Sequence, residues 1–127
     1  MRILIADDSA LVRRGVMDIL ASARNCEVCG EAKDGVEAIQ RAGELLPDLI
    51  LLDISMPGLG GLDVARVLRK EVPDAKILMM SQHDPVLFLP RAVEAGADAC
   101  MDKSRLGTDL VAAIERVERN SGAHPNR

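Results

Sequence analysis

The segment Ile50-Leu51-Leu52-Asp53-Ile54-Ser55-Met56-Pro57-Gly58 decides the fold of this chain. Its first three residues are aliphatic, as is typical of a strand buried on both faces, and Met-Pro-Gly predicts a turn soon afterwards. Asp53 therefore stands at the carboxyl end of a buried strand, where a carboxylate is costly unless it is solvated, paired or bound to a cation. Because ligands bind at that edge of open α/β sheets, Asp53 is the first candidate functional residue.

Apolar segments of strand length recur on both sides of this one, and each is followed by a segment whose apolar residues have helical spacing. The predicted strands cover residues 3–5, 27–32, 50–53, 76–80 and 99–102. We expect Ser9 to cap the helix after the first strand and Thr108 to cap the last helix. Strict alternation of strand and helix predicts an α/β fold with a doubly wound, five-stranded parallel sheet. The flavodoxin-like order 2-1-3-4-5 is expected.

Length and charge narrow the function classes. The 127 residues suit one domain, which we expect to span residues 1–119, with residues 120–127 as the start of a linker. The net charge of −4 argues against direct binding of nucleic acid by this domain. No apolar run approaches the ~20 residues that span a bilayer, and the N-terminus is unlike a signal peptide. A cytoplasmic protein without membrane contact is therefore expected.

The three cysteines do not suggest a disulfide framework or a metal site. Cys26 and Cys29 form a CxxC motif in a predicted strand, but no second pair completes a zinc site. Neighbours three residues apart on an extended strand are also too distant for a disulfide. We therefore interpret Cys26 and Cys29 as small core residues.

Polar side chains stand at the ends of four predicted strands that share one edge of the sheet: Asp7 and Asp8, Asp53, Ser81 and Lys103. Three carboxylates in one place repel each other, so a proton or a hard cation must neutralise them. Mg²⁺ prefers oxygen ligands and commonly lies between carboxylates and phosphate. Lys103 adds a positive charge and Ser81 a hydroxyl donor for phosphoryl oxygens. The set predicts a site that receives or holds a phosphoryl group, in which an aspartate can be the nucleophile.

The motifs that carry this set are Asp7-Asp8-Ser9, Leu51-Leu52-Asp53-Ile54-Ser55-Met56-Pro57-Gly58, Gly60-Gly61, Met80-Ser81, Ala95-Gly96-Ala97-Asp98 and Lys103. In these motifs, over about residues 2–118, the chain resembles the receiver domains of two-component response regulators. It is most similar to the NarL/FixJ type, whose receiver precedes a helix-turn-helix domain. The resemblance implies a CheY-like fold and an output domain, after the linker, that controls transcription.

The resemblance also implies the chemistry of the acidic residues. Asp53 would accept a phosphoryl group from the phosphohistidine of a sensor histidine kinase. Mg²⁺ would be bound by Asp8, Asp53 and the backbone carbonyl of Ser55, with Asp7 acting through a water molecule. Such a domain catalyses only its own phosphorylation and dephosphorylation, so we expect a signalling domain and not an enzyme.

A switch is implied in the same way. Lys103 would pair with one phosphoryl oxygen, and Ser81 would swing inward to bind another. That movement would shift the fourth helix and the fifth strand, with Ser81, His83 and Cys100 as the switch region. The resemblance assigns signalling to this face, so residues 86–103 are expected to contact a second copy of the domain or an output domain.

Two residues next to the lysine depart from the family pattern. Cys100 stands three positions before Lys103, where the family usually has Tyr or Phe. Asp102 replaces the usual aliphatic strand residue, and a buried acid there would compete with the site acids for Lys103.

The fourth helix is unusual as well, because Pro90 falls in its expected middle, at a cost of ~3 kcal/mol unless the helix begins there or kinks. If the helix begins at Pro85 instead, the apolar run 86–89 cannot all face inward. Some of this run should reach solvent in either case. The exposed run would serve as a docking surface. Alternatively, the run would fold inward and Phe88 would cover the gap beside Cys100, since the chain has one Phe and no Tyr or Trp.

Two other functions compete with a phosphorylated switch. One is a receiver-like module that no longer switches and only recruits a partner. The other is a phosphohydrolase with Asp53 as nucleophile, which needs an acid or base such as His83 nearby. A flavin-binding protein lacks support because no hydroxyl-rich phosphate loop follows the first strand.

Overall fold

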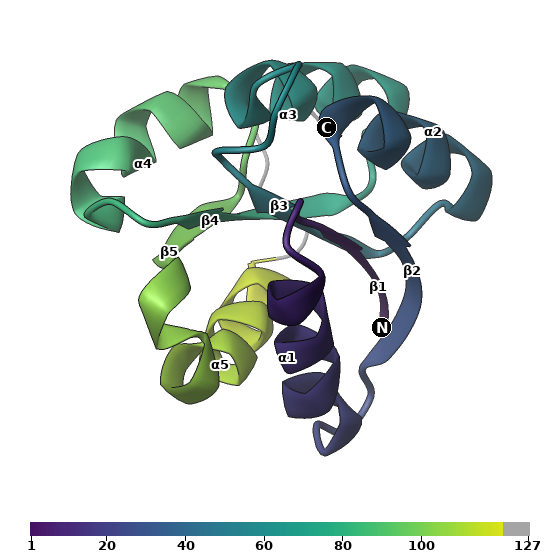
Figure 1. Ribbon diagram of the computed structural model, residues 1–127, viewed down its shortest axis with the longest axis vertical. Coiled ribbons are helices and arrows are strands. Elements are labelled where there is room, and N and C mark those ends of the chain that lie inside the picture. The colour runs from purple at the N-terminus through teal and green to yellow at the C-terminus, as the bar shows by residue number, and fades with distance from the viewer. Residues whose placement is uncertain (121–127) are drawn as a thin grey trace.

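The strands of the computed structural model, which describes residues 1–120, form one parallel sheet of order β2-β1-β3-β4-β5. This is the predicted doubly wound order (Figure 1). The elements in chain order are β1 (Arg2–Ala6), α1 (Ala10–Ala21), β2 (Glu27–Ala32), α2 (Gly35–Leu45), β3 (Leu49–Asp53), α3 (Gly61–Glu71), β4 (Lys76–Ser81), α4 (Pro85–Glu94), β5 (Ala99–Asp102), the 3₁₀ turn η1 (Lys103–Arg105) and α5 (Leu106–Arg119). Of the predicted linker, residues 121–127 lie outside the described residues.

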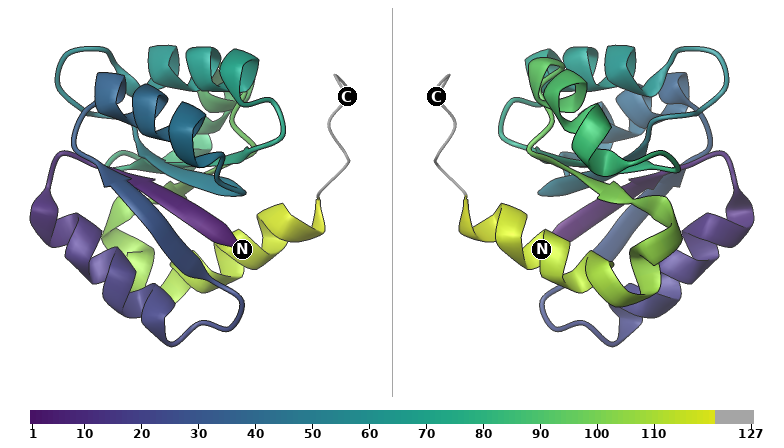
Figure 2. Two further views of the ribbon diagram at one scale, coloured as in Figure 1. Left: turned by 90° about the vertical axis from the view of Figure 1, so that its right-hand side faces the viewer. Right: turned by 90° about the vertical axis from the view of Figure 1, so that its left-hand side faces the viewer.

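Helices cover both faces of the sheet, with α2, α3 and α4 on one side and α1 and α5 on the other (Figures 1 and 2). Strand residues alternate between two apolar clusters: Ile50 and Leu52 face α2–α4, whereas Leu51 faces α1 and α5. This double burial explains why β3 is one continuous apolar run. Within the described part of the chain, no helix has both the length and the apolarity needed to cross a membrane.

The helix ends follow the sequence signals at most positions. The Ser9 side chain caps α1 by accepting from the Val12 amide at 3.2 Å. Gly96 follows the α4 C-cap with φ of 103°, a left-handed conformation that glycine adopts without strain.

The predicted cap at Thr108 is wrong. The turn η1 runs directly from β5 into α5, so the last helix begins at Leu106 and Thr108 lies in its first turn. The Thr108 hydroxyl instead donates to the Arg105 carbonyl at 3.3 Å. A 3₁₀ turn commonly precedes an α-helix in this way, and the helical spacing of the apolar residues does not reveal it.

The fourth helix begins at Pro85 and contains Pro90 in its interior. The Asp84 carboxylate caps it by accepting from the Val86 amide at 2.9 Å, and Pro85 occupies the first turn, where a proline is tolerated. Pro90 has no N–H to donate to the carbonyl of Val86, so the helix lacks one internal hydrogen bond at its middle.

Candidate functional site

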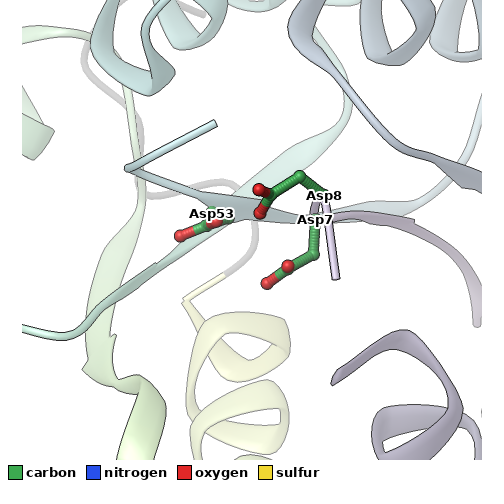
Figure 3. Close-up of side chains that lie close together, drawn as sticks. All are labelled: Asp7, Asp8 and Asp53. Carbon is green, nitrogen blue, oxygen red and sulfur yellow. The ribbon is translucent and has the colours of Figure 1, made fainter. Parts of the chain in front are cut away.

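The acidic side chains gather where β1 and β3 end. Oxygen atoms of Asp7, Asp8 and Asp53 lie within 4.8 Å of one another, and Figure 3 shows the three carboxylates side by side. Asp7 and Asp53 are buried, whereas Asp8 is exposed. The group is thus reached from solvent on the side of Asp8.

Lys103 enters this group from the end of β5. Its Nζ atom lies 2.8 Å from Oδ2 of Asp7 and 3.2 Å from Oδ2 of Asp53, and its side chain is 9% exposed. One ammonium group against three carboxylates leaves an excess of negative charge in a poorly solvated place. The arrangement therefore favours a further cation.

Electrostatics act differently on Asp53 and Lys103. Burial raises the pKa of Asp53, and the negative charge of Asp7 raises it further. The hydrogen bond from the Ser55 amide lowers this pKa but does not outweigh burial, so the pKa of Asp53 lies above its ordinary value. Burial lowers the pKa of Lys103, but its hydrogen bond to Asp7 and the charges of Asp53 and Asp7 outweigh burial and raise that pKa. Lys103 is therefore firmly protonated, and Asp53 gains from any extra positive charge.

Backbone amides fix the orientation of the two buried acids. The Ser9 amide donates to Oδ1 of Asp7 at 2.8 Å, and the Ser55 amide donates to Oδ1 of Asp53 at 3.2 Å. Because each amide lies two residues after its acid, these contacts are local turns that follow directly from the sequence. They hold the Oδ1 atoms in place while the Oδ2 atoms meet Lys103.

The carboxylate oxygens fit a divalent cation such as Mg²⁺, since they are hard ligands with an excess of negative charge. Asp8 and Asp53, the proposed direct ligands, both belong to the group, and Asp7 lies beside them. Ser55, whose carbonyl is the third proposed ligand, lies in the turn that follows Asp53 and β3.

Ser81 is the last residue of β4 and is buried. In the sheet register Asp53 is paired with Met80, so Ser81 extends one residue beyond Asp53 at the same edge. Its Oγ atom accepts a hydrogen bond from the His83 backbone amide at 3.0 Å. The hydroxyl is thus held by the loop between β4 and α4.

The other residues of interest lie around this centre. Cys100 packs against the apolar cluster under α2–α4, and burial raises the pKa of its thiol to about 11. Asp102 does not compete for Lys103, because its carboxylate turns to the Ser104 amide at 2.9 Å and the Ser104 hydroxyl at 2.7 Å. His83 is exposed, and its ring stacks on that of Phe88.

Two residues shape the site although no role was predicted for them: Arg13, and Gly61 of the Gly60-Gly61 motif. Arg13, one turn into α1, donates from its NH1 group to the Asp7 carbonyl at 2.7 Å and pairs with Glu31. A Cβ atom at Gly61 would lie 2.6 Å from Cα of Ile54 and 2.7 Å from the Asp53 carbonyl, so α3 begins in close contact with the end of β3. The position of Arg13 one turn after Ser9 was an available signal, whereas the contact of Gly61 is not visible in a local pattern.

Comparison with known proteins agrees with this geometry. The sequence family described as response regulator receiver domain matches residues 3–115. The chain is 38% identical over 117 residues to the response regulator GacA of Pseudomonas viridiflava, covering 92% of this chain and 55% of that protein. It therefore spans about half the length of the curated relatives it matches.

Solved structures show the same similarity. A LuxR-family two-component response regulator from Aurantimonas sp. SI85-9A1 superposes with a TM-score of 0.87 at 32% identity, over 96% of this chain and 90% of that one. The receiver domain of the putative regulator NarL from Mycobacterium tuberculosis gives 0.83 at 33% identity, over 92% and 95% of the two chains.

Proposed function

Because this chain belongs to the receiver domains of two-component response regulators, we propose that Asp53 accepts a phosphoryl group from a sensor histidine kinase. The observation that carries the proposal is the position of Asp53 at the end of β3. There it is buried, within 3.2 Å of the Lys103 ammonium, and grouped with two further carboxylates.

In this transfer a carboxylate oxygen of Asp53 attacks the phosphorus of the kinase's phosphohistidine. The new O–P bond forms as the P–N bond breaks, and the electron pair of that bond leaves with the imidazole nitrogen. The product is an acyl phosphate. Lys103 stabilises a phosphoryl oxygen while it keeps its ion pair with Asp7.

We propose that Mg²⁺ is bound by Asp8, Asp53 and the Ser55 carbonyl, with Asp7 acting through water. When bound, the ion neutralises negative charge on the acids and on the phosphoryl group. The Ser81 hydroxyl leaves the His83 amide and donates to a phosphoryl oxygen. This exchange is the first event of the switch.

The signalling surface in this proposal is the outer side of α4. Val86, Leu87 and Val93 are 74%, 77% and 54% exposed, and Leu89 is 40% exposed. We name these four residues the α4 patch. An exposed apolar patch of this kind suits contact with another protein, and we propose a second copy or an output domain as its partner.

The full protein would be cytoplasmic and would act on transcription through a helix-turn-helix domain after the linker at residues 120–127. That output is supported by a solved relative described as a DNA-binding response regulator of the LuxR family.

A non-switching interaction module is the second candidate, and the presence of Cys100 in place of an aromatic ring favours it. A phosphohydrolase has weaker support, because the His83 ring is engaged with Phe88. Mg²⁺-dependent phosphorylation with one phosphate per chain and no sustained turnover of a generic phosphoester would exclude both the hydrolase and a module that has lost its acceptor.

The experiment is intact-mass spectrometry after incubation with acetyl phosphate and Mg²⁺. We expect one added phosphate in the wild type and none in Asp53→Asn or in the presence of a chelator. Asp102→Asn is the matched control, since Asp102 also ends a strand but turns away from Lys103; it should still be phosphorylated. Phosphorylation of Asp53→Asn would show that the acceptor is another residue.

A further inference from the structure

A continuous set of contacts leads from Ser81 into α4. The His83 amide donates to Oγ of Ser81 at 3.0 Å. The His83 ring stacks on the Phe88 ring, with centroids 6.2 Å apart and planes inclined by 18°. Cζ of Arg91 lies 5.9 Å from the centre of the same ring. Both ring contacts are within the range of aromatic stacking and cation–π attraction, so Phe88 connects the loop after β4 to the helix.

The side chain of Cys100 cannot connect the loop to the helix in this way. Its thiol is small and packs against the apolar cluster beneath α2–α4. Phe88 is half-buried, and its ring contacts His83 and Arg91, both of which are exposed, instead of packing against that cluster. The only Phe of the chain is therefore in contact with the loop that holds the site hydroxyl.

The two halves of α4 are held very differently. In the second half Ala92 is 0% exposed, and the C-cap residue Ala95, directly after the helix, is 2% exposed. The turn that follows is anchored by Arg69, which donates to the Gly96 carbonyl at 2.9 Å. In the first half no residue is buried, and Pro90 removes one of the backbone hydrogen bonds between the halves, the one to the Val86 carbonyl. The first half can therefore move while the second half stays in place.

We propose that the His83–Phe88 stack couples the Ser81 hydroxyl to the first half of α4, with Pro90 as the hinge. When the hydroxyl turns toward the phosphoryl group, the His83 amide loses its acceptor and the loop shifts. The stacked rings carry that shift to Phe88 and so reposition Val86, Leu87 and Leu89 of the α4 patch. The coupling rests on the proposed phosphorylation of Asp53 and adds a route by which the signal reaches the surface without an aromatic residue at position 100.

The sequence offers a selective probe. Because Phe88 is the only Phe and the chain has no Trp or Tyr, incorporation of para-fluorophenylalanine labels this ring alone. Fluorine NMR before and after treatment with acetyl phosphate and Mg²⁺ then reports the surroundings of Phe88. Intact mass on the same samples reports phosphorylation separately. We expect the fluorine resonance of the wild type to shift in proportion to the phosphorylated fraction.

His83→Ala is the deciding variant, since it removes the ring and keeps the amide that binds Ser81. We expect it to be phosphorylated but to lose most of the phosphorylation-dependent fluorine shift, and His83→Tyr should restore the shift.

Val93→Ala, in the patch but beyond Pro90, should respond like the wild type. A merely structural role for His83 would lower stability and leave the shift intact, which would overturn the coupling. A phosphorylated wild type without any shift would overturn it as well. If the wild type gains no phosphate, the proposed function fails first and the coupling with it.

Discussion

The Nζ atom of Lys103 lies closer to Asp7, at 2.8 Å, than to Asp53, at 3.2 Å. The ammonium therefore keeps a buried ion pair with Asp7 if the charge of Asp53 is removed by substitution. Asp53, in contrast, is buried beside a second acid, Asp7. Among the described residues Lys103 is the only ammonium that pairs with Asp53, and Asp53 shares it with Asp7. Its ionised form is the costly member of the group.

We predict that Asp53→Asn raises the free energy of unfolding at neutral pH. Burial, together with the charge of Asp7, raises the pKa of Asp53 in the folded state. The folded state thus binds this proton more readily than the unfolded state, where the pKa is about 3.9. The associated stability is present below that value and is lost as pH rises through the folded pKa. Urea melts should show the largest gain for Asp53→Asn at neutral pH and a smaller gain in acid.

Asp102→Asn is the control, because we expect it to change the free energy of unfolding in the opposite direction. Hydrogen bonds from the Ser104 side chain and backbone lower the pKa of Asp102, so its carboxylate stabilises the folded state above the ordinary aspartate pKa. This variant should lose stability at neutral pH. A loss of stability in Asp53→Asn at neutral pH would contradict the charge balance described for the site.

A second prediction concerns Gly61. An added Cβ would lie 2.6 Å from Cα of Ile54 and 2.7 Å from the Asp53 carbonyl, both of them backbone atoms. We expect Gly61→Ala to cost ~1–3 kcal/mol of stability and to slow phosphorylation of Asp53, because the strand end must shift. The neighbouring Gly60 has open space at its Cβ position, so Gly60→Ala should cost at most ~1 kcal/mol, as the loss of an N-cap residue. Equal effects of the two substitutions in urea melts would refute the close contact.

A third prediction concerns Arg69, which holds the far end of the sheet together. Its guanidinium donates to the carbonyls of Pro73, Ala75 and Gly96 and to Oδ2 of Asp98, each at 2.9 Å. Removing it leaves these acceptors without that donor, so we expect Arg69→Ala to cost ~2–3 kcal/mol.

Arg66→Ala tests whether any arginine of α3 would have this effect. Arg66 is more exposed and forms an ion pair with Asp63 within the same helix, so its loss should cost less than ~0.5 kcal/mol. Urea melts of both variants measure the difference, and a similar loss in each would show that Arg69 is not an anchor.

The predictable parts of the molecule are those that local patterns encode. The buried run before Asp53, the Ser9 cap and the left-handed Gly96 follow from residue type and spacing, and the strand ends brought the site residues to one edge. The unpredicted parts depend on contacts between distant segments. Arg69 meets residues near position 96 only after the sheet forms, and Gly61 meets the strand end only after α3 packs.

A fourth prediction concerns the α4 patch. Leu87 and Leu89 are 77% and 40% exposed, so these two side chains do not fold inward to cover the space beside Cys100. We expect Leu87→Ser with Leu89→Ser to change the free energy of unfolding by less than ~1 kcal/mol, because little apolar area is lost from the interior. Leu68→Ala, at a fully buried position, should cost ~2–5 kcal/mol in the same assay.

The association of these variants decides what the patch does. If the patch contacts a second copy, sedimentation velocity of the phosphorylated protein should show weaker self-association in Leu87→Ser with Leu89→Ser. Leu46→Ser is the matched control, since Leu46 is 65% exposed after α2 and outside the patch; it should associate like the wild type. Unchanged association in the patch variant, with the expected small effect on stability, would leave an output domain as the partner of α4. A large loss of stability would instead show that the patch is part of the core.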